Sequence, residues 1–215
     1  MSYILSWSGG KDCCFAGYEA MRQGYKISHL MNFISDKFHK VRAHDIGVNI
    51  IQLQSQAVGI PLVQKETTWD GYEQNWKEVV KNLISGGIEG VIFGDIYVQP
   101  HKDWVERVCG ELNIEAIEPL WMKNTEEVLS GFINAGFQAV VVSAKTELID
   151  KDWIGHSVDG DFISYLRERK IDVCGENGEY HTLVIDGPIF REKIQLVKGE
   201  TVARGNYWSL DASDG

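Results

Sequence analysis

The sequence predicts an α/β fold in which a doubly wound parallel sheet precedes a smaller, less regular α+β part. Up to Pro100, short apolar runs alternate with segments of helical periodicity. Repeated β-α-β units of this kind are typical of a parallel sheet with helices on both faces. At 215 residues and 44% hydrophobic content, the chain is long enough for one large domain or two small ones. The Gln99-Pro100 step is the candidate boundary between domains over 1–99 and 100–215, and no Gly/Ser/Pro-rich linker separates them.

Glycines and one candidate cap mark the ends of the predicted elements. Gly24 and Gly59 each end a helical pattern, and Asp70 is placed to cap the helix that follows it. In the first part, strands are predicted over 3–7, 29–34, 61–66 and 90–95, and helices over 12–23, 43–58 and 70–84. In the second part, helices are predicted over 101–112, 125–135 and 160–169, and strands over 115–120, 138–143, 181–186, 193–198 and 201–209.

Composition excludes several classes of function. The formal net charge is −10, which argues against a broad nucleic-acid surface because such a surface needs a basic face. The sequence holds no apolar run long enough for a membrane span and no secretory signal pattern. None of its four cysteines forms C-x-x-C, so neither a zinc knuckle nor a thioredoxin-type site is indicated. A reducing cytoplasm is the expected location.

The segment Ser8-Gly9-Gly10-Lys11-Asp12 follows directly on the first apolar run and precedes the first helix. Two glycines let consecutive backbone N–H groups converge on an anion, and the start of a helix directs its positive end to the same point. Lys11 adds a cation and Asp12 a ligand for Mg²⁺, which together suit a nucleotide polyphosphate. The pattern is not a Walker A motif. The alternative interpretation is a Gly-rich turn that happens to carry Lys and Asp.

Two further segments carry polar side chains that can take part in chemistry. Asp95 ends the fourth predicted strand, and ligands of doubly wound sheets lie outside the carboxyl ends of the strands. It is either a contact to Mg²⁺ or substrate, or a cap of the next helix. The segment 174–182, Cys-Gly-Glu-Asn-Gly-Glu-Tyr-His-Thr, is either a hairpin turn built on Asn-Gly or a ligand site. In the second case Glu176 or Glu179 binds a cation or incoming ammonium.

Taken together, S-G-G-K-D, the central G-D-I, the late G-E-x-G-E-Y and the T-L-V-I-D-G-P that follows resemble the diphthine–ammonia ligase family. These are the N-type ATP pyrophosphatases of the PP-loop superfamily. The resemblance implies a Rossmann-like ATP-binding domain over 1–99 and a C-terminal acceptor-binding domain over 100–215. It also implies a reaction: ATP adenylates a carboxylate on a modified histidine of elongation factor 2, pyrophosphate leaves, and ammonia displaces AMP to form an amide.

The resemblance also assigns roles to residues. ATP and Mg²⁺ are the implied cofactors, and Lys11 stabilises the departing pyrophosphate while Asp12 holds the metal. Glu176 and Glu179 orient the acceptor or take a proton from ammonium. Free ammonia or an ammonia-donating partner supplies the nitrogen, because the chain has no glutaminase domain. The implied ATP-binding set is Ser8, Gly9, Gly10, Lys11, Asp12, Cys13 and Asp95, and the implied acceptor-binding set is Asn177, Gly178, Tyr180 and His181.

Three departures from the family pattern point to a divergent branch. Cys13 stands where the loop has Ser, Asn177 where the second motif has Gly, and His181 where it has a carboxylate. Trp121-Met122-Lys123 is also unusual. The ATP half of the pattern is thus kept, and the acceptor half is altered. A small carboxylate, such as a corrinoid side chain, is therefore an alternative acceptor.

Two other functions stay open from the sequence. A tRNA-modifying PP-loop enzyme shares the loop, although the acidic charge and the missing C-x-x-C count against it. A nucleotide-binding sensor shares the fold, but it has no need of the second motif. ATP turnover with and without ammonia distinguishes these cases. The basic segment 39–44, with His39 and His44, is either a lid over the site or a solvated loop.

Overall fold

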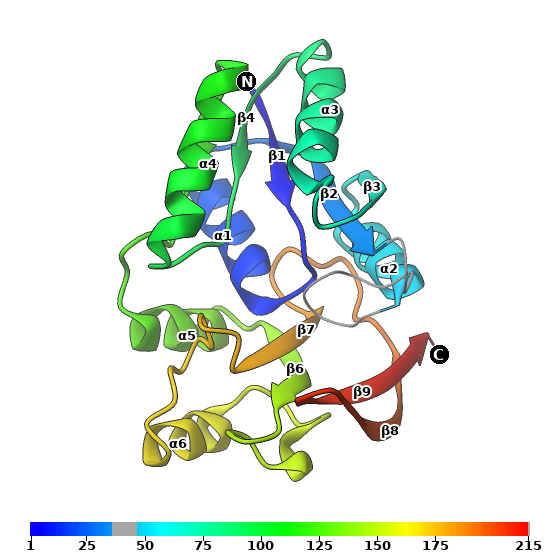
Figure 1. Cartoon of the computed structure of the whole chain (residues 1–215), viewed down its shortest axis with the longest axis vertical. Coiled ribbons are helices and arrows are strands. Elements are labelled where there is room, and N and C mark those ends of the chain that lie inside the picture. Colours follow the sequence, from blue (N-terminus) through cyan, green and yellow to red (C-terminus); the bar gives the residue numbers. More distant parts are fainter. Residues whose placement is uncertain (36–46, 215) are drawn as a thin grey trace.

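The computed structural model describes residues 1–35 and 47–214 and contains two sheets, one above the other (Figure 1). The first is parallel, with strand order β3-β2-β1-β4-β5. Its strands are β1 (Ser2–Ser6), β2 (Ile27–Ser35), β3 (Leu62–Thr67), β4 (Ile88–Ile92) and β5 (Glu115–Ile117). The helices between them are α1 (Lys11–Arg22), α2 (Val48–Val58), α3 (Tyr72–Ile84) and α4 (Gln99–Leu112). The predicted Rossmann-like, doubly wound fold is confirmed.

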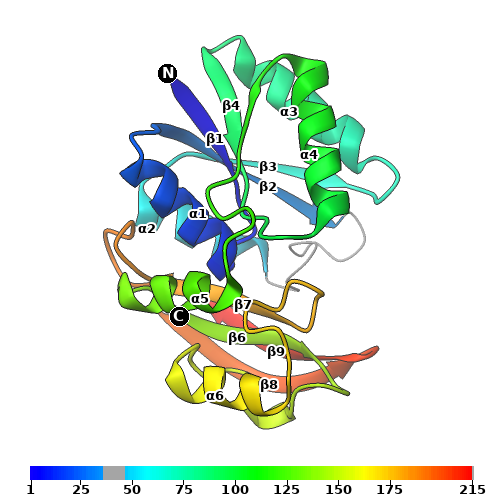
Figure 2. The same cartoon turned by 90° about the vertical axis from the view of Figure 1, so that its left-hand side faces the viewer.

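Helices cover both faces of the first sheet. Figure 2 shows α1 and α2 on one side and α3 and α4 on the other. The α3 and α4 side forms its own core around Trp76, which is fully buried and stacks on Phe93. The α1 side continues without a break into the second part of the chain, because Phe15 of α1 packs against Phe132 and Phe137. The two sheets therefore share one core.

The second sheet is antiparallel, with strand order β7-β6-β9-β8. It comprises β6 (Gln138–Lys145), β7 (Tyr180–Asp186), β8 (Leu196–Arg204) and β9 (Tyr207–Asp214). Of its helices, α5 (Thr125–Asn134) lies between this sheet and α1, and α6 (Gly160–Glu168) lies on the opposite side (Figure 2). Asn124 and Asp159 cap these two helices through side-chain oxygens that accept from backbone N–H groups of the first turn.

The structure differs from the sequence-based expectations at several places, among them the last two strands, β8 and β9, which run over Leu196–Arg204 and Tyr207–Asp214 and not over 193–198 and 201–209. Strand β5 follows α4 into the first sheet, so this sheet extends beyond the expected boundary at Gln99-Pro100. The N-cap of α3 is Gly71, without a side-chain bond, and not Asp70. The Asn177-Gly178 turn joins the end of α6 to β7, and β7 pairs with β6, so the predicted hairpin is wrong. The segment with His39 and His44 lies outside the described residues, and so do residues 43–46 of the predicted second helix.

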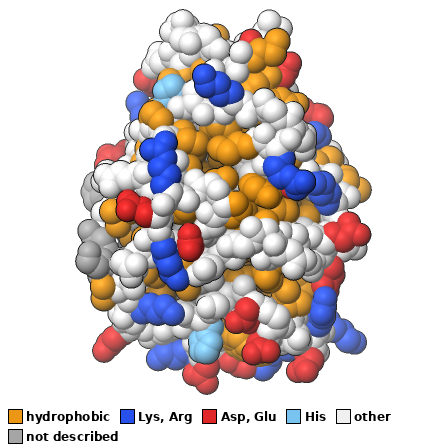
Figure 3. All heavy atoms as spheres, turned by 180° about the vertical axis from the view of Figure 1, so that it is seen from behind, with side chains coloured by type: hydrophobic (Ala, Val, Ile, Leu, Met, Phe, Trp, Pro, Cys, Tyr) orange, Lys and Arg blue, Asp and Glu red, His pale blue; other side chains and the backbone are white. Residues whose placement is uncertain are grey.

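The face that carries α1 and α2 is mixed in character. Figure 3, viewed from behind, shows hydrophobic side chains in the centre, with Lys and Arg side chains standing apart from one another around them. In the described part of the chain no helix is both long and apolar enough to cross a membrane.

Candidate active site

The phosphate loop, residues 7–10 between β1 and α1, lies at the carboxyl edge of the parallel sheet. Strand β4 is the direct neighbour of β1, so the loop and the segment after β4 share the point where strand order reverses. Gly94 makes this proximity possible. A Cβ atom on Gly94 would lie 2.8 Å from the Asp12 carbonyl carbon and 2.8 Å from the Cys13 nitrogen, so only glycine lets the two segments touch.

The loop is fastened to the second sheet by backbone and side chain. The N–H of Val184 on β7 donates to the carbonyl oxygen of Gly9 at 3.0 Å, and the N–H of Lys11 donates to Thr182 Oγ1 at 3.0 Å. From α2, the fully buried Gln54 donates through Nε2 to the carbonyl oxygens of Gly9 and Val184 at 2.9 and 2.8 Å. Its Oε1 accepts from Trp7 Nε1 at 2.9 Å. The loop is therefore shaped by α2 and β7 as well as by its own sequence.

Lys11 is a shielded cation at the base of the loop. Its side chain is 4% exposed, and Nζ donates to Asp12 Oδ2 at 3.0 Å and to the carbonyl oxygen of Cys174. Nζ also lies 4.9 Å from the centre of the Tyr180 ring. Burial lowers the pKa of Lys11, but the Asp12 carboxylate beside it, together with Tyr180 and Cys174, outweighs burial and holds the pKa well above its usual value. Two of its three N–H donors are used, which leaves one for a ligand.

Asp12 is the one predicted metal ligand, and its chemistry fits that role. Oδ2 is paired with Lys11, whereas Oδ1 is buried and has no hydrogen-bond partner. A buried polar atom without a partner is unusual and marks a place for a ligand or ion. Burial raises the pKa of Asp12, and Lys11 acts in the opposite direction. The described residues hold no group of three or more His, Cys, Asp or Glu suited to a metal, but Mg²⁺ at nucleotide sites needs only one or two carboxylates besides phosphates and water.

A cavity of about 620 Å³ opens next to this pair and draws its lining from both sheets. Glu179, Gly9 and Gly10 do not line it; Gly10 is the N-cap of α1. Of the residues singled out from the sequence, the structure brings the following to its wall: Ser8, Lys11, Asp12, Cys13, Asp95, Glu176, Asn177, Gly178, Tyr180 and His181.

Cys13 continues the loop's hydrogen bonding where the family has Ser. Its Sγ donates to the carbonyl oxygen of Gly10 at 3.2 Å and accepts from Ser8 Oγ at 3.4 Å. Ser8 Oγ also accepts from the N–H of Gly10 at 3.3 Å. The thiol is therefore part of a short network that holds the start of α1.

Glu176 is the carboxylate of the second motif that faces the cavity. Its Oε2 accepts from the N–H of Ile96 at 3.2 Å, which joins the turn before β7 to the loop after β4. Burial raises the pKa of Glu176 to about 7, and the nearby Asp12 adds to the shift. Tyr97 makes a second link across the same gap, because its OH donates to Asp172 Oδ2 and accepts from Asn177 Nδ2, both at 3.1 Å.

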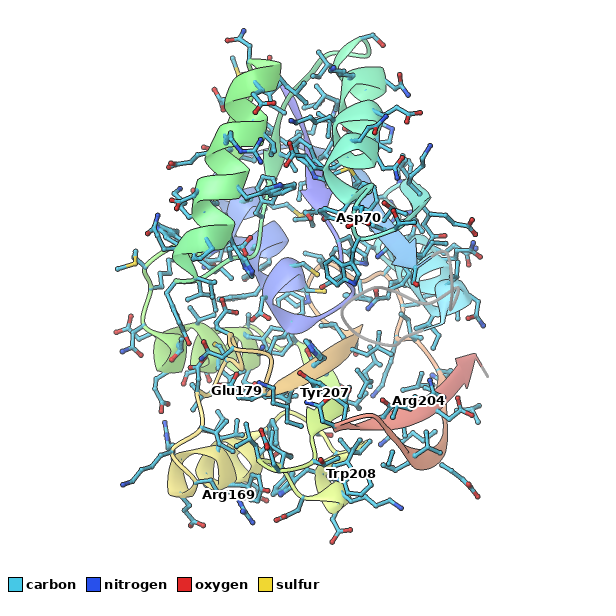
Figure 4. The ribbon with its side chains drawn as sticks, viewed as in Figure 1. Asp70, Arg169, Glu179, Arg204, Tyr207 and Trp208 are labelled. Carbon is cyan, nitrogen blue, oxygen red and sulfur yellow. The ribbon has the colours of Figure 1, made fainter. Side chains whose placement is uncertain are left out.

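Glu179 supports the turn from outside the cavity. One of its carboxylate oxygens accepts from the N–H of Asn177 at 2.9 Å and the other from Asn177 Nδ2 at 3.2 Å. Figure 4 shows Glu179 and Tyr207 below α1, on the side of the second sheet that faces the first. Tyr207 OH donates to the carbonyl oxygen of Gly178 at 2.9 Å, and its ring stacks on His181 at 6.2 Å. Tyr180 is buried under Lys11, and its OH donates a hydrogen bond to the carbonyl oxygen of Val173 at 2.5 Å.

Asp95 has a partner that the sequence did not indicate. Its Oδ1 lies 3.0 Å from Nδ1 of His101, which also lines the cavity from the first turn of α4. Asp95 does not cap this helix, whose N-cap is Val98 without a side-chain bond. The sequence offered one signal for this contact: His101 comes six residues after Asp95, at the start of the helix that follows the same edge of the sheet.

An anion-binding backbone, a shielded cation and a carboxylate oxygen without a partner meet where the strand order reverses. This combination defines a nucleotide-binding α/β enzyme with a PP-loop. Comparison with known families gives the particular one. The model of the diphthamide synthase N-terminal domain matches residues 1–116, and that of the diphthamide synthase C-terminal domain matches residues 124–212. The chain belongs to the diphthamide synthase family and is an ATP-dependent ligase.

Relatives with assigned activities span most of the chain. A diphthine–ammonia ligase of Rattus norvegicus is 29% identical over 220 residues, which cover 91% of this chain and 82% of the rat protein. A diphthine–ammonia ligase of Homo sapiens is 28% identical, with the same two coverages. A solved structure, described as a predicted subunit of tRNA methyltransferase from Methanocaldococcus jannaschii, is 15% identical with a TM-score of 0.46. It covers 90% of this chain and 100% of that chain.

Proposed function

We propose that this chain uses ATP to adenylate a carboxylate and then converts it into an amide with ammonia, releasing pyrophosphate and AMP. The observation that carries the proposal is the shared cavity. The Lys11–Asp12 pair of the phosphate loop and Glu176 of the second motif line one space of about 620 Å³. That space lies within the size range of small-molecule sites, so nucleotide and acceptor can meet in it.

In the first step the phosphate loop binds ATP through the backbone N–H groups at the start of α1. The free N–H of Lys11 donates to the phosphates, and its charge offsets the negative charge that builds up on the departing pyrophosphate. Asp12 Oδ1 is the protein ligand for Mg²⁺, which when bound neutralises phosphate charge. The acceptor carboxylate attacks the α-phosphorus, and the bond from that phosphorus to pyrophosphate breaks.

In the second step ammonia attacks the carbonyl carbon of the acyl-adenylate and AMP leaves. Glu176 faces the cavity from the second motif and binds the incoming nitrogen. Asn177 and His181 lie at the acceptor end, and Glu179 shapes the turn that carries them. We therefore assign the nucleotide to the loops of the first sheet and the acceptor to the segment 174–182 of the second part. The connections between the two parts keep water away from the adenylate until ammonia arrives.

The proposed acceptor is diphthine on elongation factor 2, as the names of the relatives indicate. A corrinoid carboxylate is the second candidate, because His181 replaces a carboxylate at the acceptor end and changes its charge. Ammonia is taken from solution or from a donor protein. The four free, buried cysteines fit a reducing cytoplasm.

The test is to identify the products. Purified protein is incubated with Mg²⁺-ATP, ammonium and either diphthine-bearing elongation factor 2 or a corrinoid carboxylate, and the nucleotides are separated. We expect AMP and pyrophosphate in amounts that match the amide formed, and only with the correct acceptor. ADP as the product would contradict the adenylation. ATP binding without turnover in any mixture would indicate a sensor.

A further inference from the structure

His101 lies in the first turn of α4, beside the carboxyl edge of the parallel sheet. Its Nδ1 is 3.0 Å from Oδ1 of Asp95, and both residues line the cavity of the candidate active site. Pro100 occupies the start of the same turn, where its fixed backbone angle suits a helix. The imidazole is therefore presented to the cavity from a regular helix and held there by a neighbouring carboxylate.

The contact fixes which ring nitrogen carries the hydrogen. A carboxylate accepts hydrogen bonds and donates none, so Nδ1 of His101 donates to Asp95. Nε2 then keeps its lone pair in the neutral ring. Among the described residues, no group hydrogen-bonds to Nε2. A histidine oriented in this way by a carboxylate is arranged to take up a proton, because the carboxylate stabilises the imidazolium that forms.

The charges around the ring act in the same direction. The hydrogen bond that His101 donates to Asp95 raises the pKa of His101, partial burial opposes this rise, and Glu176 raises the pKa further. Asp12 and Lys11 also line the cavity, and they are paired with each other. The ring of His101 therefore shares the cavity with Asp95 from the loop after β4, with Glu176 from the turn before β7, and with the Lys11–Asp12 pair at the start of α1.

We propose that His101 is the catalytic base of the amide-forming step and that Asp95 is the residue that positions it. This inference rests on the proposed function and adds the proton acceptor to it. The ammonia nitrogen uses its lone pair to form the C–N bond. The bond from the carbonyl carbon to the AMP phosphate oxygen breaks, and AMP leaves with that electron pair. The nitrogen arrives as ammonium, and the proton that it gives up to free this lone pair goes to Nε2 of His101, while the second proton, lost after the C–N bond has formed, goes to water.

The other candidates in the cavity are less suited to this step. Glu176 already accepts from the N–H of Ile96 through Oε2. Both oxygens of Glu179 accept from Asn177, and Glu179 does not line the cavity. His181 stacks against Tyr207. His101 combines a place on the cavity wall with a carboxylate partner on one ring nitrogen and a lone pair on the other.

The experiment separates the two half-reactions in His101→Gln, with His156→Gln as the matched control. His156 is exposed and packs against Trp153, outside the cavity lining. Diphthine-bearing elongation factor 2 is the acceptor. Acceptor-dependent exchange of labelled pyrophosphate into ATP reports adenylation alone. AMP release is then measured with ammonium and, separately, with hydroxylamine, which is neutral at neutral pH and needs no base to free its lone pair.

For His101→Gln we expect unchanged pyrophosphate exchange and a loss of about 100-fold in ammonium-dependent turnover, the usual size of a general-base contribution. Turnover with hydroxylamine should stay close to that of the parent. His156→Gln should match the parent in all three assays. A loss of exchange equal to the loss of turnover, or equal losses with both nucleophiles, would overturn the assignment of His101. Absence of exchange in the parent would instead refute the proposed function.

Discussion

The N–H of Val184 donates to the carbonyl oxygen of Gly9 at 3.0 Å, and this bond joins the phosphate loop to a strand of the other sheet. Gln54 reinforces the connection, because its Nε2 donates to the carbonyl oxygens of both residues. The loop is thus held from α2 and from β7 at one point. The nucleotide site is therefore a joint property of the two sheets, and substitutions in either should affect it.

Replacing Gln54 with Leu should lower both stability and ATP affinity. The substitution leaves the buried Trp7 Nε1 without its acceptor and frees the loop from α2. We expect a loss of about 2 kcal/mol in the free energy of unfolding, measured with urea, and a higher KM for ATP. Gln52→Leu is the control on the same helix, since Gln52 is exposed and bonds to Gln64. Equal effects in the two variants would contradict a special role for Gln54.

Lys11→Met should slow AMP formation by about 100-fold or more, the loss that follows removal of one donor to developing charge. It should also destabilise the protein by about 3 kcal/mol, because Asp12 is then buried without a partner. The double variant Lys11→Met, Asp12→Asn removes that charge. We expect it to recover stability but not activity. Thermal unfolding and nucleotide analysis test the two halves, and a double variant as unstable as the single one would refute the account of the pair.

Glu176→Gln should be more stable than the parent at neutral pH and equal to it in acid. The pKa of Glu176 rises from 4.5 to about 7 on folding, so the folded chain holds the proton more tightly. The free energy of unfolding of the parent therefore decreases as pH rises from 4.5 to 7, whereas that of Glu176→Gln does not. The difference should reach about 3 kcal/mol at most. Urea unfolding at pH 4 and pH 8 measures it, and a constant difference between these pH values would contradict the shift.

Asp95→Asn should move the pH dependence of ammonium turnover. The Asp95 carboxylate raises the pKa of His101, so its loss lets the ring become neutral at lower pH. The acid limb of kcat/KM for ammonium should shift to lower pH, and the plateau should fall because the ring is less well oriented. A fall in the plateau with the acid limb unmoved would indicate a purely structural role.

Gly175→Ala and Gly178→Ala should differ although both glycines have similar backbone angles. Their φ values are +69° and +74°, so alanine is strained at either position, by about 1 kcal/mol. At Gly175 the new Cβ would also lie 2.7 Å from the Tyr180 ring, which packs under Lys11. At Gly178 the nearest atom is Tyr207 Oη at 3.4 Å. We therefore expect Gly175→Ala to lose more free energy of unfolding and more ATP turnover than Gly178→Ala.

The parallel sheet was predictable because its signals are local. Gly24 and Gly59 end their helices where predicted, and apolar runs between helices can only be buried strands. A strand was predicted over 115–120, but its place beside β4 was not, because the pairing of this three-residue strand with β4 is a long-range choice that no local signal specifies. The predicted hairpin at Asn177 was wrong because a turn signal specifies a local reversal and not which strand becomes the neighbour.

The candidate site was predictable where chemistry is concentrated in a short segment. The loop through Asp12 and the turn through Glu176 meet as expected at one cavity. Gln54 was not found, because a polar residue inside an apolar helical pattern gives no sign of partners 45 and 130 residues away. His101 was missed because its role depends on the register of α4 against the sheet edge. Glu179 is the opposite case. The motif around it suggested a role in the chemistry, but its carboxylate oxygens accept hydrogen bonds from Asn177 and stabilise the turn itself.

The hydrogen bond from Lys11 to Thr182 spans 171 residues, and this has a consequence for how the protein is made. On the ribosome the phosphate loop emerges long before the strand that holds it. A nascent chain that has completed the parallel sheet still lacks Cys174, Thr182 and Val184, the partners of its loop. The ability to hold ATP is therefore acquired only after β7 has been made, so chains truncated before β7 should not compete for the nucleotide.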